Sequence, residues 1–253
     1  MALKSLSDID ENLLKRIVNA ITKAVGPDMR DFQETYPTDT QNGYGLQRGN
    51  FINTNLRSLE KDIPDLILKD FSRGPWEGRL LLLRNLKITM SIMTRSTFKS
   101  ITSQVRDWPH YLKTILSIEN SGIKSAYDEP SLFNHFSENP QFPREVYKKD
   151  YESITGIESE EISQFTHVVI VYEFDSGEII NMEALLLTPE FKISESRSLM
   201  EMVETDFAHL TAETFPADEI QPDAHSLVKI KNKDQIVKII NVKSDSKDDE
   251  GGK

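Results

Sequence analysis

Residues 165–187 read FTHVVIVYEFDSGEIINMEALLL, and this stretch decides the type of fold. Two β-branched and apolar runs, FTHVVIVYEF and EIINMEALLL, flank Asp175-Ser176-Gly177, residues of the types that tight turns favour. Pro189 follows the second run and ends a strand, because proline has no N–H to donate to a neighbouring strand. The stretch therefore predicts a β-hairpin whose two strands need further strands beside them.

A second group of strands is expected between residues 65 and 93. LKITMSIM (86–93) alternates apolar and polar residues, as a strand with one buried face does. RLLLL (79–83) is mostly apolar, as a strand covered on both faces is, and DLILKDFS (65–72) supplies a third strand. Residues 84–87 form the turn that places Arg79 opposite Ile92. We therefore expect an antiparallel sheet built from a three-stranded meander and a hairpin.

Helices are expected before, between and after these strands. Apolar residues recur every three or four positions through 8–25, where Asp8 and Glu11 have capping-box spacing and Gly26-Pro27 fits the end of a helix. Residues 29–50 are polar and turn-rich, and we expect a long loop there. Shorter helices are predicted near residues 51–60, 96–105, 108–120 with Asp107 as the cap, 143–153 and 195–207.

Strands in two groups, with helices kept apart from them, indicate the α+β class with segregated helices. We expect a single domain over residues 1–243, with an irregular insertion near 123–162 and a small last hairpin in 226–243. Residues 244–253 (SDSKDDEGGK) are charged and lack an apolar anchor, so they are predicted to be a disordered tail.

Composition excludes several classes of protein. The chain has 253 residues, of which 38% are hydrophobic, and it has no cysteine, which excludes disulfides, thiol nucleophiles and cysteine-ligated metals. There is no run of about 18 apolar residues and no apolar signal-peptide core. We therefore expect a cytoplasmic protein that has no membrane partner.

Charge is distributed unevenly along the chain. The net charge is −11, yet residues 73–113 hold eight Lys and Arg against two acidic residues, and residues 150–225 hold eighteen acidic residues against two basic ones. Either the two segments face each other and neutralise, or the basic segment binds a phosphate group or an acidic partner. General polyanion binding is not expected of so acidic a protein, so nucleic acid is the less favoured partner.

Three carboxylates on the predicted hairpin, Glu173, Asp175 and Glu183, are the candidates for a metal-dependent nuclease. With a two-residue loop, Glu173 lies opposite Ile180. Glu183 then lies opposite Ile170 on the other face, so the carboxylates do not converge. The five histidines lack metal-ligand spacing, and the common catalytic and phosphate-loop motifs are absent. We expect neither a metal ion nor a cofactor.

The basic segment holds candidates for binding an anion. Arg79 falls on an apolar strand face, where it needs a salt bridge to an acidic residue of the C-terminal half or an anionic ligand. His110 begins a helix, where it can cap the helix, stack on an aromatic ring or bind phosphate, whereas His167 is expected to be buried and hydrogen-bonded. The anion-binding candidates are Arg79, Arg84, Lys87, Arg95 and His110.

Three motifs, in this order along the chain, resemble a bacterial family of uncharacterised proteins, a domain of unknown function often linked to mobile elements. They are a Trp-led hairpin, WEGRLLLL (76–83); TMSIMTRSTF (89–98), with an Arg-x-x-Phe helix start; and a His-Tyr-Leu helix over 110–120. The resemblance covers residues 48–205, and Gly78 and the four-leucine run depart from it. It implies a bacterial or prophage protein in the cytosol, and it implies no activity.

Two classes of function remain. The first is a regulatory or interaction protein that binds a protein, a nucleic acid or a second copy of itself through residues 29–50 or the basic segment. The second is an enzyme that acts on a phosphate-containing substrate, or a metal-dependent nuclease. A concave pocket that joins Arg79, Arg95 and His110 would favour the enzyme, and a flat patch would favour the binding protein. The missing catalytic motifs favour the first class.

Overall fold

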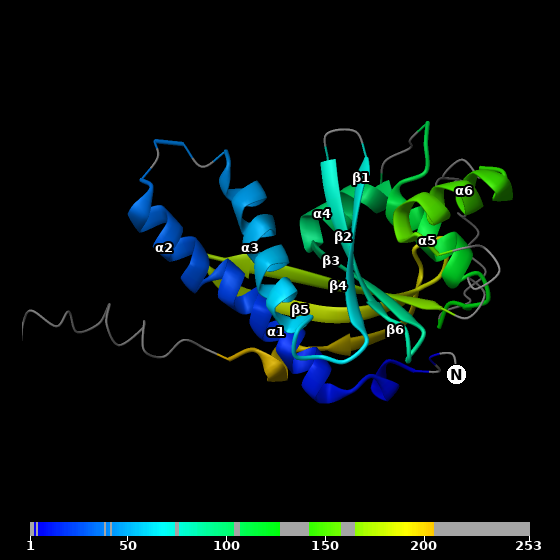
Figure 1. Cartoon of the computed structure of the whole chain (residues 1–253), viewed down its shortest axis with the longest axis horizontal. Helices are drawn as coiled ribbons and strands as arrows, with labels where there is room; N and C mark the ends of the chain where they lie inside the picture. The colour runs from blue at the N-terminus through cyan, green and yellow to red at the C-terminus, as the bar shows by residue number, and fades with distance from the viewer. Residues whose placement is uncertain are drawn as a thin grey trace, which may run out of the picture. The chain divides into compact units, whose positions relative to one another are not determined.

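The computed structural model describes residues 3, 5–37, 39–40, 42–73, 76–103, 107–126, 142–157 and 165–204, all within one compact unit, residues 1–204. They form a six-stranded sheet with helices on both of its faces (Figure 1), which confirms the predicted α+β class. The predicted last hairpin, the tail and the C-terminal part of the predicted single domain lie outside the described residues. In the part of the chain that is described, no helix is long and apolar enough to cross a membrane.

The sheet follows the order of the chain, so each strand pairs with its neighbours in sequence. The strands are β1 (Leu66–Arg73), β2 (Trp76–Leu83), β3 (Ile88–Thr94), β4 (Thr166–Asp175), β5 (Glu178–Leu187) and β6 (Ile193–Ser198). All adjacent pairs are antiparallel except β3 and β4, which are parallel. The predicted meander and hairpin are confirmed, and a parallel pair joins them because the chain between β3 and β4 crosses over through helices.

Strand β6 stands where the sequence predicts a helix over 195–207. Leu199, Met202 and Val203 have helical spacing but do not belong to an α-helix, because Leu199 and Met202 are buried at the short 3-10 turn η4 (Met200–Met202). The residues before this turn, ISESRS, pair with β5. These six residues are mostly polar and predict a strand only weakly, whereas the apolar residues after them have the spacing of a helix.

Helices precede the sheet and connect its two halves. They are η1 (Leu6–Asp8), α1 (Glu11–Val25), α2 (Pro27–Thr35), α3 (Tyr44–Leu59), α4 (Arg95–Ser103), α5 (Tyr111–Glu119) and α6 (Arg144–Thr155). The helix predicted over 8–25 is α1, but its cap is Asp10, whose side chain accepts a hydrogen bond from the Leu13 N–H at 2.8 Å. Asp8 forms its capping box with Ser5, at the start of η1.

The long loop predicted over residues 29–50 is wrong, because α2 and the first turns of α3 occupy most of it. Gly26 ends α1 as expected, but Pro27 then starts α2. Proline is tolerated there because the first turn of a helix does not use the backbone N–H that proline lacks. Aromatic rings hold the two helices together: Phe32 lies 6.3 Å from Tyr44 and 6.1 Å from Phe51 between ring centroids. Local composition does not reveal such contacts between distant residues.

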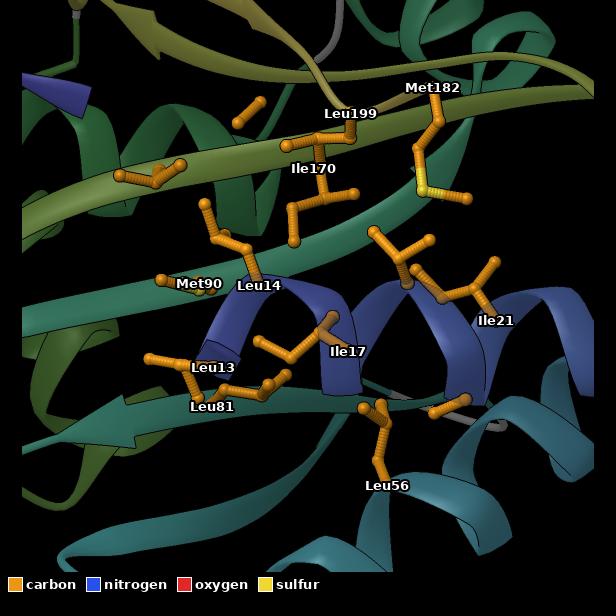
Figure 2. Packing of buried hydrophobic residues seen from close by; sticks show 14 of the residues in the cluster. Leu13, Leu14, Ile17, Ile21, Leu56, Leu81, Met90, Ile170, Met182 and Leu199 are labelled. Atoms are coloured by element: carbon orange, nitrogen blue, oxygen red, sulfur yellow. The ribbon is translucent and has the colours of Figure 1, made fainter. Parts of the chain in front are cut away.

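Apolar side chains cover both faces of the sheet and form two cores. On one face α1 and α3 pack against the strands, and Figure 2 shows Leu14 and Ile17 of α1 in this core together with Met90 and Ile170. On the other face α4, α5 and α6 bury a second set of residues. The four leucines of β2 serve the two cores in alternation, as predicted for a strand covered on both faces.

Candidate functional site

The sheet opens between β2 and β3. β2 pairs with β1 along its whole length, but with β3 only over Leu81–Leu83. The Leu83–Ile88 pair confirms the predicted register around the turn. Because β2 extends to Trp76 and β3 extends to Thr94, the two strands part beyond the Leu81–Met90 pair. In the sheet as described, no strand fills this gap, so β2 and β3 each keep a backbone edge along it.

A cavity of about 1160 Å³, called the cleft below, lies where the two strands part. Its walls come from α3, β2, β3, α4 and the segment that leads into α5. Both regions expected to bind a partner, residues 29–50 and the basic segment 73–113, contribute to it. Among the lining residues without charge are Leu46, Gly49, Asn50, Gly78, Ile92, Thr94, Ser96, Thr97, Trp108 and Tyr111.

Two arginines of the cleft already have acidic partners. Arg79 Nε lies 2.5 Å from Asp70 of β1, and its Nη1 donates to the Asn53 carbonyl at 2.7 Å. The hydrogen bond from Arg79 lowers the pKa of Asp70. Arg73 pairs with Asp150 of α6 and donates to a backbone carbonyl at 2.7 Å. The predicted salt bridge from Arg79 to an acidic residue of the C-terminal half is therefore wrong, because β1, directly beside β2, supplies the carboxylate.

Two acidic residues of the cleft carry charge that the described structure does not neutralise. Glu77 and Asp107 line the cleft and are exposed, and neither forms an ion pair with any other described residue. Because both arginines are paired, the net field of the cleft walls is set by these carboxylates. The cleft is therefore better suited to a neutral or cationic ligand than to a phosphate.

The five anion-binding candidates do not converge. Arg79 and His110 line the cleft, but Arg95 lies outside it and pairs with Glu183 of β5 at 2.9 Å. Arg84 and Lys87 belong to the turn at the closed end of the β2–β3 pair, away from the gap. Within the described chain, a concave site thus joins Arg79 and His110 but leaves out Arg95.

His110 caps α5, which corrects the expectation that Asp107 does so. Its Nδ1 accepts a hydrogen bond from the Leu112 N–H at 3.2 Å, and its ring centroid lies 4.4 Å from that of Tyr111. The predicted capping and stacking roles are both confirmed. α5 begins at Tyr111 and not at Trp108, so the cap falls on His110, the residue next to the helix.

A chain of buried polar side chains runs along β3 on the side that α5 covers. His167 of β4 lies between two hydroxyls of β3: its Nδ1 is 2.6 Å from Thr89 Oγ1, and its Nε2 is 3.0 Å from Ser91 Oγ. Thr89 donates to the carboxylate of Glu119 on α5, which also accepts a hydrogen bond from Tyr151 of α6 at 2.6 Å. All five side chains are buried, and the burial expected of His167 is confirmed.

Tyr111 lines the cleft and lies beside this chain, because Ser91 lowers the pKa of its hydroxyl against the larger opposite effect of burial. Burial raises the pKa of Glu119 to about 7 and lowers the pKa of His167 to about 3. Burial also raises the pKa of Tyr111. At neutral pH, Glu119 is therefore the group of the chain that is poised to gain or lose a proton.

Sequence reasoning misses this chain for a definable reason. The alternation in LKITMSIM places Thr89 and Ser91 on a polar, solvent-facing side of the strand, but both are fully buried. β3 has helices over both faces, so its polar face has to find partners inside the protein. The signal that could have revealed this chain is the pair of hydroxyls at alternate positions of β3, because β3 lies beside the strand that carries His167.

The predicted carboxylate pairings on the β4–β5 hairpin are wrong by one residue. Glu173 lies opposite Asn181, and Glu183 lies opposite Val171, because the register shifts between Glu173 and Phe174. Such a bulge adds one residue to one strand, and a sequence pattern does not fix its place. Among the described residues, no group of three or more His, Asp or Glu is arranged to hold a metal ion.

A family model described as a family of unknown function (DUF5986) matches residues 6–247. No curated protein and no solved structure matches the chain.

Proposed function

The chain belongs to the family of unknown function DUF5986, and we propose that it is a protein-binding module. In this proposal the cleft takes up an extended segment of a partner protein, which adds as a strand in the gap between β2 and β3. The observation that carries the proposal is the short ladder between these strands, which joins only three residue pairs. The cytoplasmic, bacterial or prophage setting expected from the sequence is part of the same proposal.

Free backbone edges support this mode of binding. β1 occupies one edge of β2 and β4 occupies one edge of β3, and the other edges face the gap beyond Leu81 and Met90. An extended peptide bonds its N–H and C=O groups to such an edge, and its alternate side chains then enter pockets on either side. Walls around the edge limit which chains can reach it, which an open outer edge does not do.

The walls of the cleft define the chemistry of the partner segment. Leu46 is 74% exposed and Trp108 is 59% exposed, so both offer apolar surface to a ligand. Glu77 and Asp107 add negative charge, which speeds the association of a basic segment and selects against an acidic one. We therefore expect the bound segment to alternate apolar side chains with polar ones and to carry Lys or Arg.

Selection from a random-peptide library displayed on phage, with the full chain immobilised, tests the proposal. A synthetic copy of a selected peptide is then titrated with the chain by fluorescence anisotropy. Trp108→Ala and Leu46→Ala each remove an exposed anchor without opening the core, so we expect each to weaken binding by about tenfold, the loss of roughly 1.4 kcal/mol.

Ile180→Ala is the matched control, because Ile180 is 55% exposed on β5 and does not line the cleft. We expect it to leave peptide binding unchanged. If no peptide is selected, or if the control weakens binding as much as the cleft variants, the cleft is not the site. If the chain pairs with itself through the open edges instead, sedimentation will show a dimer that Trp108→Ala disrupts.

An enzyme that acts on a phosphate-containing substrate is the second candidate, because Arg79 and His110 line one concave site. Against it stand the paired guanidinium of Arg79 and the capping role of His110. Titration with inorganic phosphate, followed by the amide resonances of Arg79 and His110, separates the two functions. Shifts confined to these residues would favour the enzyme.

A further inference from the structure

One arginine at the edge of the cleft has no acidic partner. Arg48 of α3 is half-buried, and its guanidinium forms no hydrogen bond or ion pair with any other described residue; its Nε is fully buried. By contrast, four other arginines pair with carboxylates: Arg57, Arg73, Arg79 and Arg95. Burial lowers the pKa of Arg48, because it penalises the charged form. A bound anion would offset this penalty.

An aromatic ring holds the guanidinium of Arg48 in place. Its Cζ lies 3.9 Å from the centroid of the Phe174 ring on β4. Such stacking uses the flat face of the guanidinium, whereas its N–H donors point outward in the plane of the group. Phe174 therefore orients Arg48 and leaves its donors available.

A buried hydroxyl lies next to this stacked pair. Tyr172 precedes Phe174 by two residues on β4, and their ring centroids are 6.1 Å apart. Tyr172 is 4% exposed and lines the cleft, yet its hydroxyl bonds to no other described residue. Burial raises its pKa to about 12, against the opposite effect of Arg48, so the hydroxyl stays a donor at neutral pH. Because buried polar groups normally have partners, this hydroxyl indicates a ligand.

The surroundings favour an anion and leave it room. Thr94 of β3 lies opposite Tyr172, and α4 begins directly after it, so the partial positive charge of that helix end is close by. Gly45 lies one turn before Arg48 on α3 and lines the cleft, and nothing lies within 4 Å of a Cβ placed there. Since a helical side chain extends over the turn before it, this space leaves Arg48 accessible from the cleft.

We propose that Arg48 and Tyr172 form a binding site for one carboxylate group at the edge of the cleft. A guanidinium binds a carboxylate through two parallel N–H···O bonds, and the Tyr172 hydroxyl donates to the same group. A carboxylate fits better than a phosphate, because one guanidinium neutralises one charge and Glu77 and Asp107 of the cleft repel the additional charge of a phosphate.

The source of the carboxylate rests on the proposed function of the cleft. In that function the partner segment supplies it, from an acidic side chain or from its own C-terminus. The segment then combines one carboxylate for Arg48 with basic side chains for Glu77 and Asp107.

Sodium acetate, the simplest carboxylate probe, tests the site in the full chain without a partner. ¹H–¹⁵N spectra follow the Nε–H of Arg48 and the backbone amide of Tyr172, with acetate replacing chloride at constant ionic strength. The titration runs to about 100 mM, which detects binding as weak as one tenfold step from the 1 M standard state. We expect both resonances to shift along one saturating curve. No saturating shift, or the same shift at a lower concentration of inorganic phosphate, overturns the proposal.

Three variants separate the site from general charge attraction. Arg48→Gln keeps a helix-forming side chain, so we expect only the acetate-dependent shift of Tyr172 to disappear. Tyr172→Phe keeps the ring and should weaken acetate binding about fivefold, which corresponds to roughly 1 kcal/mol. Arg57→Gln is the matched control, because it makes the same charge change on α3 at an arginine that already pairs with Asp70. Equal weakening by Arg57→Gln and Arg48→Gln would overturn the site.

A selected peptide then locates the carboxylate in the partner segment. Synthetic versions remove one carboxylate at a time, by amidation of the C-terminus or by replacement of an acidic side chain with its amide. We expect one version to bind the wild type about tenfold more weakly and to bind Arg48→Gln unchanged relative to the parent peptide. Equal losses with both proteins would overturn the partner as the source and leave the acetate result in force. Failure to select any peptide contradicts the proposed function, and the acetate titration still decides the site.

Discussion

Glu119 and His167, buried 4.0 Å apart, have opposite effects on the stability of the protein. Burial raises the pKa of Glu119 from 4.5 to about 7, so the unfolded chain loses this proton first and stability falls as pH rises through that window. Burial lowers the pKa of His167 from 6.5 to about 3, so the unfolded chain gains this proton first and stability falls as pH drops through that window. Where the windows overlap, the two effects oppose each other.

Glu119→Gln removes one of these effects. We expect its free energy of unfolding to rise with pH between about 4.5 and 6.5, where that of the wild type changes little. Over this range the two profiles should diverge by about 3 kcal/mol, since each pH unit between the unfolded and the folded pKa of Glu119 contributes about 1.4 kcal/mol. Urea unfolding at a series of pH values measures it, and parallel profiles would show that Glu119 does not titrate in the folded protein.

Asn120 closes the end of the sheet through its side-chain amide. Nδ2 donates to the carbonyls of His167 at 2.9 Å and Leu187 at 2.8 Å, and Oδ1 accepts from the His167 N–H at 2.8 Å. These backbone groups lie beyond the last β4–β5 pair, so the amide replaces the strand neighbour that they lack. One fully buried residue therefore ties the end of α5 to two strands.

Asn120→Leu keeps the volume of this side chain and leaves three backbone groups without partners. We expect it to lower the free energy of unfolding by about 3 kcal/mol or more, since each buried unsatisfied group costs about 1–3 kcal/mol. Chemical denaturation measures the change. Asn12→Leu on the exposed side of α1 is the control and should stay within about 0.5 kcal/mol of the wild type; equal losses in both would contradict the role of Asn120.

Among the elements, α3 carries glycines that its own fold does not require. Nothing lies within 4 Å of a Cβ placed at Gly45 or Gly49, and both residues line the cleft. Helix stability alone would favour alanine at both positions. The missing side chains therefore leave space in the cleft at a cost in helix stability.

Gly45→Ala/Gly49→Ala is expected to raise the free energy of unfolding by about 1–2 kcal/mol, because each alanine loses less conformational entropy on folding. The same variant should weaken binding of a selected peptide, since its methyl groups fill the cleft. Thermal unfolding and peptide titration measure the two effects. Gly156→Ala, at φ +66° and with Lys69 Nζ 2.9 Å from the new Cβ, should destabilise instead. A double variant less stable than the wild type would contradict the open space.

Periodic elements can be predicted from this sequence, and elements defined by distant partners cannot. α1 carries its own apolar stripe from Leu13 to Val25, and the apolar, β-branched runs of β4 and β5 predict strands without reference to any other part of the chain. α2, the start of α3, and β6 have polar sequences that form regular structure because Phe32, Phe51 and the edge of β5 hold them. The cleft is missed for the same reason, because it depends on where β2 and β3 stop pairing.

At the scale of the molecule, two ion pairs join the basic and acidic segments of the chain. Arg73 of the basic segment binds Asp150, and Arg95 binds Glu183. Both acidic partners belong to the segment 150–225. Within the described residues, part of the charge asymmetry is therefore neutralised across internal contacts. Arg84 lies exposed in the turn between β2 and β3 and takes no part in these pairs.

We expect the chain to bind DNA or RNA no better than an ordinary acidic protein, because the basic segment is partly neutralised and the net charge is −11. Nucleic-acid titration at roughly 50 and 200 mM salt measures this, with Arg84→Glu/Lys87→Glu alongside. Tight binding at low salt that this variant abolishes would make nucleic acid the first-choice partner. Weak, equal binding by both proteins is the expected result.

The position of α1 has a consequence during synthesis. α1 is made first, yet the strands that bury its apolar face include β4 and β5, and η4 packs there as well. At translation rates of about 5–20 residues per second, the face waits on the order of ten seconds before these partners leave the ribosome. An apolar helix in that position is a natural ligand for a chaperone. The emerging chain is therefore at its most vulnerable to aggregation before β5 is complete, however stable the finished sheet is.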